Sequence, residues 1–259
     1  MNCRITKAFR DKKSGLLSIY FTAGFPELQD GPAILKNLEL SGADIVEVGI
    51  PFSDPLADGP VIQKSNERAL RNGMSIRVLF DQFKGFRKSV RIPVILMTYF
   101  NPVMQFGIDS FITEAAQIGF DGVIIPDLPL EEYIKIRKYF KKHKFKNIFV
   151  FPIQADAERI RKMDNLSDAF LYLVTSPSIT GSKKFDAIAF REQFKEIKKL
   201  QLKNPILGGF GISDAEAFRE VSFVADGAVI GSAFIDALEK RGSGEEVVRD
   251  FIHSILQNN

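Results

Sequence analysis

Short apolar runs alternate with longer amphipathic stretches along the whole chain. The apolar runs are rich in β-branched residues and carry few charges, which is typical of strands buried in a parallel sheet. They predict eight strands, over Leu16–Phe21, Asp44–Gly49, Pro93–Tyr99, Gly122–Pro126, Asn147–Phe151, Ala169–Val174, Pro205–Gly209 and Ala228–Ile230.

The stretches between the strands have apolar residues at helical spacing. Ile34, Leu35 and Leu38 share one face, and a second stripe is expected at Tyr133, Ile134, Arg137 and Phe140. Strand and helix alternating eight times within 259 residues favours a closed (β/α)8 TIM barrel over an open doubly wound sheet. We expect one domain over residues 1–259, with extra helical pieces near Arg4–Phe9 and within Ser75–Ser89.

A short pattern recurs before three of the predicted strands. GADIVEVG begins at Gly42, GFDGVIIP at Gly119 and VADGAVIG at Val224, and each places an aspartate, Asp44, Asp121 or Asp226, in front of an apolar run. A repeated helix-to-strand turn in a barrel would produce this pattern. Asp and Gly are also common in unrelated turns, so the pattern alone leaves both explanations open.

Composition narrows the functional class. A net charge of +3 is small for this length and favours neither nucleic acid nor an anionic membrane as a partner. The single cysteine, Cys3, excludes an internal disulfide and a thiolate zinc site. The sequence lacks a signal-peptide core and an apolar run of membrane-spanning length, which predicts a cytoplasmic protein.

One carboxylate lies inside a predicted buried strand. Glu47 interrupts the apolar run IVEVG, and burying an unpaired carboxylate is costly or raises its pKa. Apolar surroundings would tune Glu47 as an acid or base, although a structural ion pair would also explain it. Asp54 and Asp58 follow on the loop where a barrel places its active site. Asp58 precedes Gly-Pro, so a turn or helix N-cap is an equal alternative for that residue.

Glycines follow the last two predicted strands. Gly209 and Gly211 come after the seventh strand, and Gly231 and Ser232 come after the eighth, where barrels commonly bind phosphate. A tight turn alone would also use Gly209 and Gly211. The two histidines, at positions 143 and 253, do not lie at strand ends, so we expect neither histidine catalysis nor a metal site.

At this level of detail the chain resembles a known family. IVEVGIPFSDPLADGPVIQ from Ile45 is similar to the signature of the tryptophan synthase alpha subunit. The resemblance extends over essentially the whole chain through FTAGFP at Phe21, MTYFNP at Met97, IPDLP at Ile125, YLVTSPSITG at Tyr172, GGFGI at Gly208 and GSA at Gly231. The block PFSDPLADGP is highly specific, whereas GFGI and GSA are shared with other phosphate-binding barrels.

The resemblance implies a lyase that cleaves indole-3-glycerol phosphate to indole and glyceraldehyde 3-phosphate by a retro-aldol reaction. Glu47 matches the residue that protonates the indole ring carbon and removes a hydroxyl proton, and Asp58 matches the residue that binds the indole N–H. The positions that match substrate-binding residues are Tyr20, Tyr172, Thr180, Gly181, Gly211, Gly231 and Ser232.

The resemblance also implies a partner. The alpha subunit carries no cofactor, and a beta subunit that holds pyridoxal phosphate receives the indole in an α2β2 complex. We expect that subunit to dock on loops around the barrel mouth, at Pro51, Asp54, Pro55, Asn101, Pro102 and Asp127. Two positions depart from the family: Ser176 stands about where better-known members have arginine, and Tyr20 is often phenylalanine.

Three other functions remain open from the sequence. A different phosphate-binding barrel, such as a sugar-phosphate isomerase or aldolase, would normally need a lysine or histidine at a strand end, and none is found. A barrel that only activates a partner would not need both Glu47 and Asp58. A stand-alone lyase that releases free indole fits the same residues, because the difference between the two lies in a surface.

Overall fold

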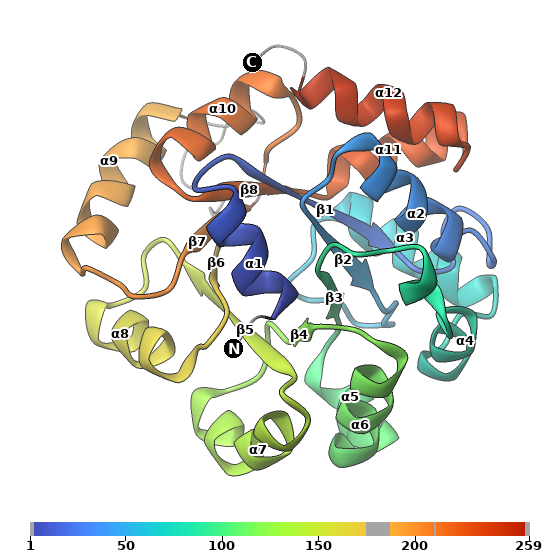
Figure 1. The fold of residues 1–259 in the computed structure, drawn as a ribbon, viewed down its shortest axis with the longest axis horizontal. Helices are drawn as coiled ribbons and strands as arrows, with labels where there is room; N and C mark the ends of the chain where they lie inside the picture. Colours follow the sequence, from blue (N-terminus) through green and yellow to red (C-terminus); the bar gives the residue numbers. More distant parts are fainter. Residues whose placement is uncertain (1–2, 175–186, 210, 257–259) are drawn as a thin grey trace.

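Eight parallel strands close into a barrel in chain order (Figure 1). The computed structural model describes residues 3–174, 187–209 and 211–256. The strands are β1 Leu16–Thr22, β2 Ile45–Gly49, β3 Val94–Met97, β4 Gly122–Ile124, β5 Lys146–Pro152, β6 Leu171–Val174, β7 Ile206–Gly209 and β8 Gly227–Ile230. The predicted TIM barrel is confirmed, and pairing of β1 with β8 completes the closure.

Helices surround the barrel and follow every strand (Figure 1). Several of the connections after strands hold two helices instead of one. The helices are α1 Arg4–Asp11, α2 Gly31–Ser41, α3 Pro60–Arg71, α4 Ile76–Gln82, the 3₁₀ helix η1 Phe86–Lys88, α5 Phe100–Phe106, α6 Ile108–Ile118, α7 Leu130–His143, α8 Ala157–Leu166, α9 Ala187–Lys199, α10 Ala215–Val224, α11 Ser232–Arg241 and α12 Glu245–Leu256. The expected extra helices near the N-terminus and within residues 75–89 are thus present as α1, α4 and η1.

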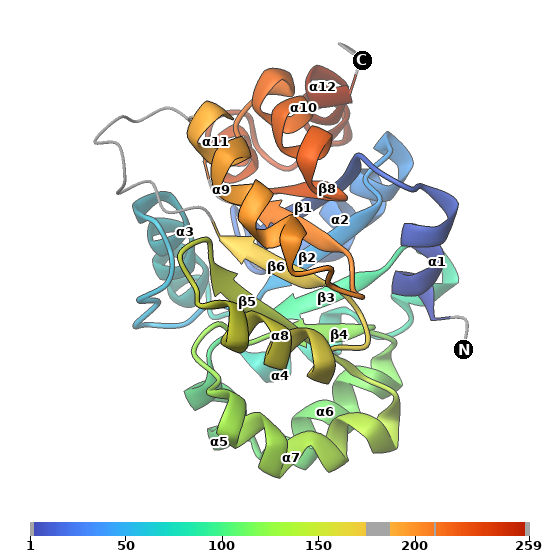
Figure 2. The same cartoon turned by 90° about the vertical axis from the view of Figure 1, so that its left-hand side faces the viewer.

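Helix α1 lies across the amino-terminal end of the barrel (Figure 2). Its Ile5 is fully buried and joins a cluster of side chains from the barrel interior, including Leu16, Ile45 and Val229. Because this apolar layer closes that end, access to the interior is left at the opposite end, where the strands finish. None of the helices in the described ranges is long and apolar enough to cross a membrane.

Strand β1 shows how the interior is built. Leu16 lies in the interior cluster, and period-two alternation places Ser18, Tyr20 and Thr22 on the same face. The residues between them, such as Ile19, pack into the larger cluster under the helices. On the interior face of β1, polar residues therefore replace apolar ones toward the carboxyl end of the strand. The polar end of the barrel interior is where we look for the functional site.

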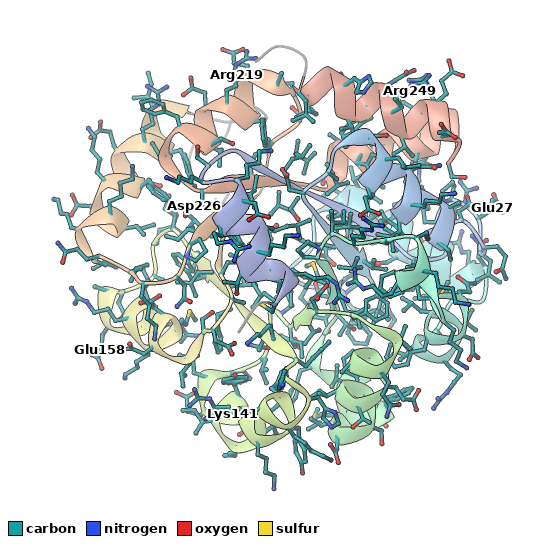
Figure 3. All side chains as sticks on the ribbon, in the orientation of Figure 1. Glu27, Lys141, Glu158, Arg219, Asp226 and Arg249 are labelled. Carbon is teal, nitrogen blue, oxygen red and sulfur yellow. The ribbon has the colours of Figure 1, made fainter. Side chains whose placement is uncertain are left out.

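The three recurring aspartates make the same two hydrogen bonds. Asp44, Asp121 and Asp226 each accept the backbone N–H of a neighbouring strand residue (Leu17, Val94 and Ile206) at 2.8, 2.9 and 2.7 Å. Each aspartate N–H also donates to the carbonyl of that same residue. Figure 3 shows Asp226 close to the barrel at the end covered by α1. The repeated-turn interpretation is therefore confirmed, and these aspartates link adjacent strands.

Helix α7 corrects one expected stripe. Tyr133 and Phe140 are buried and pack together with ring centroids 5.4 Å apart, but Ile134 is 57% exposed. Ile134 follows Tyr133 directly, and consecutive helical residues point about 100° apart. Its assignment to the buried face was wrong because the spacing allows only one of the two neighbours to face the barrel.

Candidate active site

A cavity of about 410 Å³ opens at the carboxyl ends of the strands. Its volume lies in the range of small-molecule sites. Its wall is largely apolar and includes Met97, Ile124 and Val150 from three successive strands. Seven of the residues expected from the sequence line this cavity together: Tyr20, Glu47, Asp58, Tyr172, Gly211, Gly231 and Ser232.

Glu47 is a fully buried carboxyl group that lines the cavity. Its side chain is fully buried in β2, and the Ser18 hydroxyl donates a hydrogen bond of 2.8 Å to its Oε1. Its Oε2 has no hydrogen-bond partner among the described residues. Burial raises the pKa of Glu47 to about 7, against the opposing effect of the Ser18 hydrogen bond. The structural ion pair considered for Glu47 is absent from the described part of the chain.

Asp58 lies on the loop between β2 and α3, at the rim of the same cavity. Asn66 Nδ2 donates to its Oδ2 at 3.4 Å, and the Tyr99 hydroxyl is a second hydrogen-bond partner. Burial raises the pKa of Asp58 to about 6, and these two partners oppose the rise. Burial thus raises the pKa of both carboxyl groups, and Asp58 has two hydrogen-bond partners that favour its ionised form where Glu47 has one.

The N-cap alternative for Asp58 does not hold. Helix α3 begins at Pro60, its N-cap is Gly59, and no side chain caps it. Asp58 instead contributes its backbone carbonyl, which accepts from Gln63 Nε2 at 2.9 Å. Its carboxyl group is therefore left to the cavity and to Asn66 and Tyr99.

Two tyrosines, Tyr20 on β1 and Tyr172 on β6, form part of the cavity wall. Each ring occupies the space next to a glycine of the following strand: a Cβ added to Gly49 would lie 2.1 Å from the Tyr20 hydroxyl, and one added to Gly209 would lie 2.3 Å from the Tyr172 hydroxyl. Burial raises the pKa of both phenols, so both are neutral at pH 7. They present flat apolar surfaces with a polar edge near the two carboxyl groups.

Glycines and a helix N-terminus form the other end of the cavity. Gly211 has a left-handed backbone (φ +74°), and a Cβ there would meet nothing within 4 Å. Helix α11 begins at Ser232 after Gly231, without a side-chain cap, whereas the N-cap Asp214 of α10 accepts from Ala217 N. Within the described ranges, no side-chain cap is thus bound to the N-terminus of α11, as in a helix that binds an anion. No lysine or arginine of the described ranges lines the cavity.

The expected rim residues differ in accessibility. Asp54, Asn101 and Asp127 are exposed, Pro55 and Pro102 are half-buried, and Pro51 is buried. Asp127 Oδ1 accepts from Phe100 N, the first residue of α5, at 2.8 Å. Thr180 and Gly181, expected at the substrate, lie outside the described residues, as does Ser176.

Three residues that contact the carboxyl groups were missed by the sequence analysis. Ser18 is hidden in an apolar run, Asn66 lies in the middle of α3, and Tyr99 ends the predicted third strand. Only Tyr99 carried a signal, because it belongs to the motif MTYFNP directly after a strand. Among the described residues, no group of three or more His, Cys, Asp or Glu side chains could hold a metal ion.

A closed parallel barrel with a fully buried and a half-buried carboxyl group in an apolar cavity at its carboxyl end is a (β/α)8-barrel enzyme. Comparison with known proteins defines it further. The family model for the tryptophan synthase alpha chain matches residues 6–257. The chain therefore belongs to the tryptophan synthase alpha chain family, and it is a carbon–carbon lyase of tryptophan biosynthesis that cleaves indole-3-glycerol phosphate.

Relatives cover nearly the whole chain. The tryptophan synthase alpha chain of Flavobacterium johnsoniae is 46% identical over 97% of this chain and 99% of its own. That of Christiangramia forsetii is 48% identical over 88% of this chain and 90% of its own. The crystal structure of the Legionella pneumophila alpha chain superposes with a TM-score of 0.89 at 32% identity, covering 99% of this chain and 97% of that one. The family implies a beta-subunit partner and is consistent with a subunit without its own cofactor.

Proposed function

We propose that Glu47 is the acid and base of the cleavage and that Asp58 stabilises the indole as it becomes positively charged. The observation that carries this assignment is that one apolar cavity holds two carboxyl groups in different surroundings: Glu47 is fully buried with one hydrogen-bond donor, and Asp58 is half-buried with two. A protonated Glu47 can give a proton, while an ionised Asp58 can accept a hydrogen bond from the ring N–H.

The reaction balances with these two groups. Glu47 gives its proton to the indole ring carbon that bears the glycerol chain, and the ring becomes a cation that Asp58 stabilises through its N–H. The glycerol hydroxyl next to the ring then returns a proton to Glu47 as the carbon–carbon bond breaks. The bonding electrons restore the indole, the hydroxyl carbon becomes the aldehyde of glyceraldehyde 3-phosphate, and Glu47 ends protonated as it began.

The phosphate of the substrate is assigned to the glycine-lined end. Gly211, Gly231 and Ser232 come from the loops after β7 and β8, and the uncapped N-terminus of α11 offers N–H donors. Thr180 and Gly181 are proposed as further substrate contacts on the family resemblance alone. The apolar wall with Tyr20 and Tyr172 would hold the indole ring between the two ends. Binding energy from the phosphate would then orient the ring against Glu47.

The partner is proposed to be a beta subunit bound at the barrel mouth in an α2β2 complex. A groove of about 670 Å³ runs between residues 52–56 and α3, and it includes Asp54 and Pro55. Leu56 also lines this groove and is 93% exposed, so its side chain is accessible for an apolar contact with a partner. Asn101, Pro102 and Asp127 would extend the contact, and the buried Pro51 would support the loop from below.

The remaining assignments follow from the family and the reaction. The cleavage needs only proton transfers, so we propose that this subunit uses neither metal nor cofactor and that pyridoxal phosphate belongs to the beta subunit. We also propose that residues 1–259 act as one domain, that the protein is cytoplasmic, and that nucleic acid and membranes are not partners.

Indole release, measured while the beta subunit is titrated into the purified chain, tests the coupled function. The isolated chain should release indole slowly, and a saturating beta subunit should increase the rate strongly, because docking orders the loop that carries Asp58. Asp54→Ala should weaken this activation more than it weakens the basal rate. Glu158→Ala is a matched control for loss of a carboxylate, because Glu158 is exposed on α8 and lines neither the cavity nor the groove. A fast isolated chain with no activation and no complex by size would identify a stand-alone lyase instead.

A further inference from the structure

Ser18 lies directly beneath the catalytic end of the cavity but does not line it. It is fully buried on the interior face of β1, one layer deeper than Tyr20. The parallel register pairs Ser18 with Ile45 and Tyr20 with Glu47, so Ser18 lies diagonally below Glu47 across the β1–β2 pair. A ligand in the cavity would therefore meet Glu47 and not Ser18, which would act on the ligand through its hydrogen bond to Glu47.

The two carboxyl oxygens of Glu47 differ in their hydrogen bonding to Ser18. Ser18 Oγ donates to Oε1 at 2.8 Å, while Oε2 has no partner in the described part of the chain, although it is also shielded from solvent. The χ3 torsion of a glutamate is soft and roughly two-fold. Without a fixed donor, rotation about χ3 would therefore interchange Oε1 and Oε2 freely. The hydrogen bond from the Ser18 hydroxyl restricts this rotation, because one carboxyl oxygen must stay next to β1 to accept it.

The choice of a hydroxyl group suits a residue that must be both acid and base. A lysine or arginine at position 18 would keep Glu47 ionised, and an ionised Glu47 could not donate a proton. An apolar residue would leave the buried carboxylate without any donor and would raise its pKa further. One neutral donor stabilises the anion only moderately, which agrees with the opposing effects of burial and Ser18 on Glu47.

We propose that Ser18 is a positioning residue that holds Oε1 of Glu47 against the barrel floor and presents Oε2 to the substrate for both proton transfers. The Oε2–H bond breaks as the ring carbon–hydrogen bond forms, and Oε2 later takes the hydroxyl proton as the carbon–carbon bond breaks. Ser18 keeps its own proton throughout. This inference rests on the proposed role of Glu47 and adds which oxygen reacts and what holds it in place.

The test is the pH profile of kcat/KM for indole release by Ser18→Ala with saturating beta subunit. The reaction begins with protonated Glu47, so the rate falls as pH rises through the Glu47 pKa. Without the Ser18 donor that pKa rises, and the fall should move to higher pH by roughly one unit, the value of one hydrogen bond to a charged group. Loss of orientation should also lower kcat roughly 10-fold at the optimum. The other titratable groups of the cavity, Tyr20, Asp58, Tyr172 and Asp236, are unchanged in this variant.

Two further variants make the result specific. Ser18→Cys keeps nearly the same volume but offers a weak donor, so its profile should fall between wild type and Ser18→Ala. Ser222→Ala removes a hydroxyl on α10 that is shielded from solvent and unpartnered in the described structure, and its profile should match the wild type. A folded Ser18→Ala with an unmoved profile would overturn the role of Ser18.

Glu47→Gln separates this inference from the proposed function. If Glu47→Gln loses indole release and Ser18→Ala keeps the wild-type profile, only the positioning role of Ser18 fails. If folded Glu47→Gln retains near-normal turnover, the acid–base assignment itself fails, and the position of Ser18 loses its functional meaning with it.

Discussion

Tyr20 on β1 is connected to Ser65 on α3 through a chain of hydroxyl groups. Tyr20 and Thr22 hydroxyls lie 3.2 Å apart, Thr22 and Ser65 hydroxyls lie 2.7 Å apart, and Ser65 donates to the carbonyl of Ile62 at 2.8 Å. Because Ser65 uses its only proton on Ile62, the chain runs from Tyr20 to Thr22 to Ser65. It ties the cavity wall to the helix that carries Asn66, a partner of Asp58.

Tyr20→Phe should remove the first link of this chain and keep the ring that faces the indole. Thr22 and Ser65 would remain bonded to each other, so the free energy of unfolding should fall by only about 0.5–1.5 kcal/mol. KM for indole-3-glycerol phosphate should change less than threefold, or about 0.6 kcal/mol. Urea unfolding and steady-state kinetics measure the two effects. A loss of turnover comparable with that of a Glu47 variant would show that the hydroxyl takes part in the reaction.

Asp226→Ala should reduce stability without reducing activity. Asp226 accepts the N–H of Ile206 at the start of β7, at the barrel end opposite the cavity. Leaving that strand N–H without its acceptor should lower the free energy of unfolding by about 1–3 kcal/mol, as measured by urea unfolding.

Glu158→Ala is the matched control for Asp226→Ala. Glu158 is a mostly exposed carboxylate on α8 whose ion-pair partner in the described part of the chain is Lys162, so its removal should change stability by less than about 0.5 kcal/mol. Equal effects of the two substitutions would contradict a structural role for the repeated aspartates.

The sequence was sufficient for the order of the elements because polarity changes sharply at each boundary. Glu47 could be singled out because a carboxylate in a run of Ile and Val has few structural explanations. The recurring Asp44, Asp121 and Asp226 could be singled out because the turn that needs them is repeated. Such features are local, so a single stretch of sequence contains all the information that they need.

The contacts of the two carboxyl groups could not be predicted, because they depend on register and on side chains from separate elements. Ser18 meets Glu47 only because β1 and β2 pair with Ser18 opposite Ile45. Tyr99 was expected to end a strand, but β3 stops at Met97 and Tyr99 is the N-cap residue of α5. That early stop places the Tyr99 hydroxyl at the Asp58 loop, where it accepts from Ala57 N at 3.0 Å.

Gly211→Asp should abolish binding of inorganic phosphate. Phosphate that binds the folded wild type raises its Tm, whereas the variant would place a carboxylate at the glycine-lined end of the cavity. The substitution also forces an L-residue into a left-handed backbone (φ +74°). Gly242→Asp controls for this strain, because Gly242 has φ +82° and equally open surroundings at the end of α11. The Tm of Gly242→Asp should still rise with phosphate. A rise of equal size in Gly211→Asp would place the phosphate site elsewhere.

Glu47→Gln should change the pH dependence of stability. Folding raises the pKa of Glu47 from 4.5 to about 7, so the folded state binds this proton more tightly, and wild-type stability decreases as pH rises through that interval. The neutral glutamine lacks this decrease, and the variant should gain up to about 3 kcal/mol relative to wild type between pH 4 and pH 8. Urea unfolding at both pH values measures the gain. A stability difference between the two proteins that is independent of pH would mean that Glu47 is not desolvated.

Indole release by Glu47→Gln, measured with saturating beta subunit, tests the assigned acid and base most directly. Loss of the proton donor should reduce kcat by ~10²–10⁴-fold, while the Tm of the variant still rises with phosphate. Glu158→Gln, at an exposed position on α8 away from the cavity and the groove, should keep wild-type turnover. A folded, phosphate-binding Glu47→Gln that releases indole within a few-fold of the wild-type rate would contradict the role of Glu47.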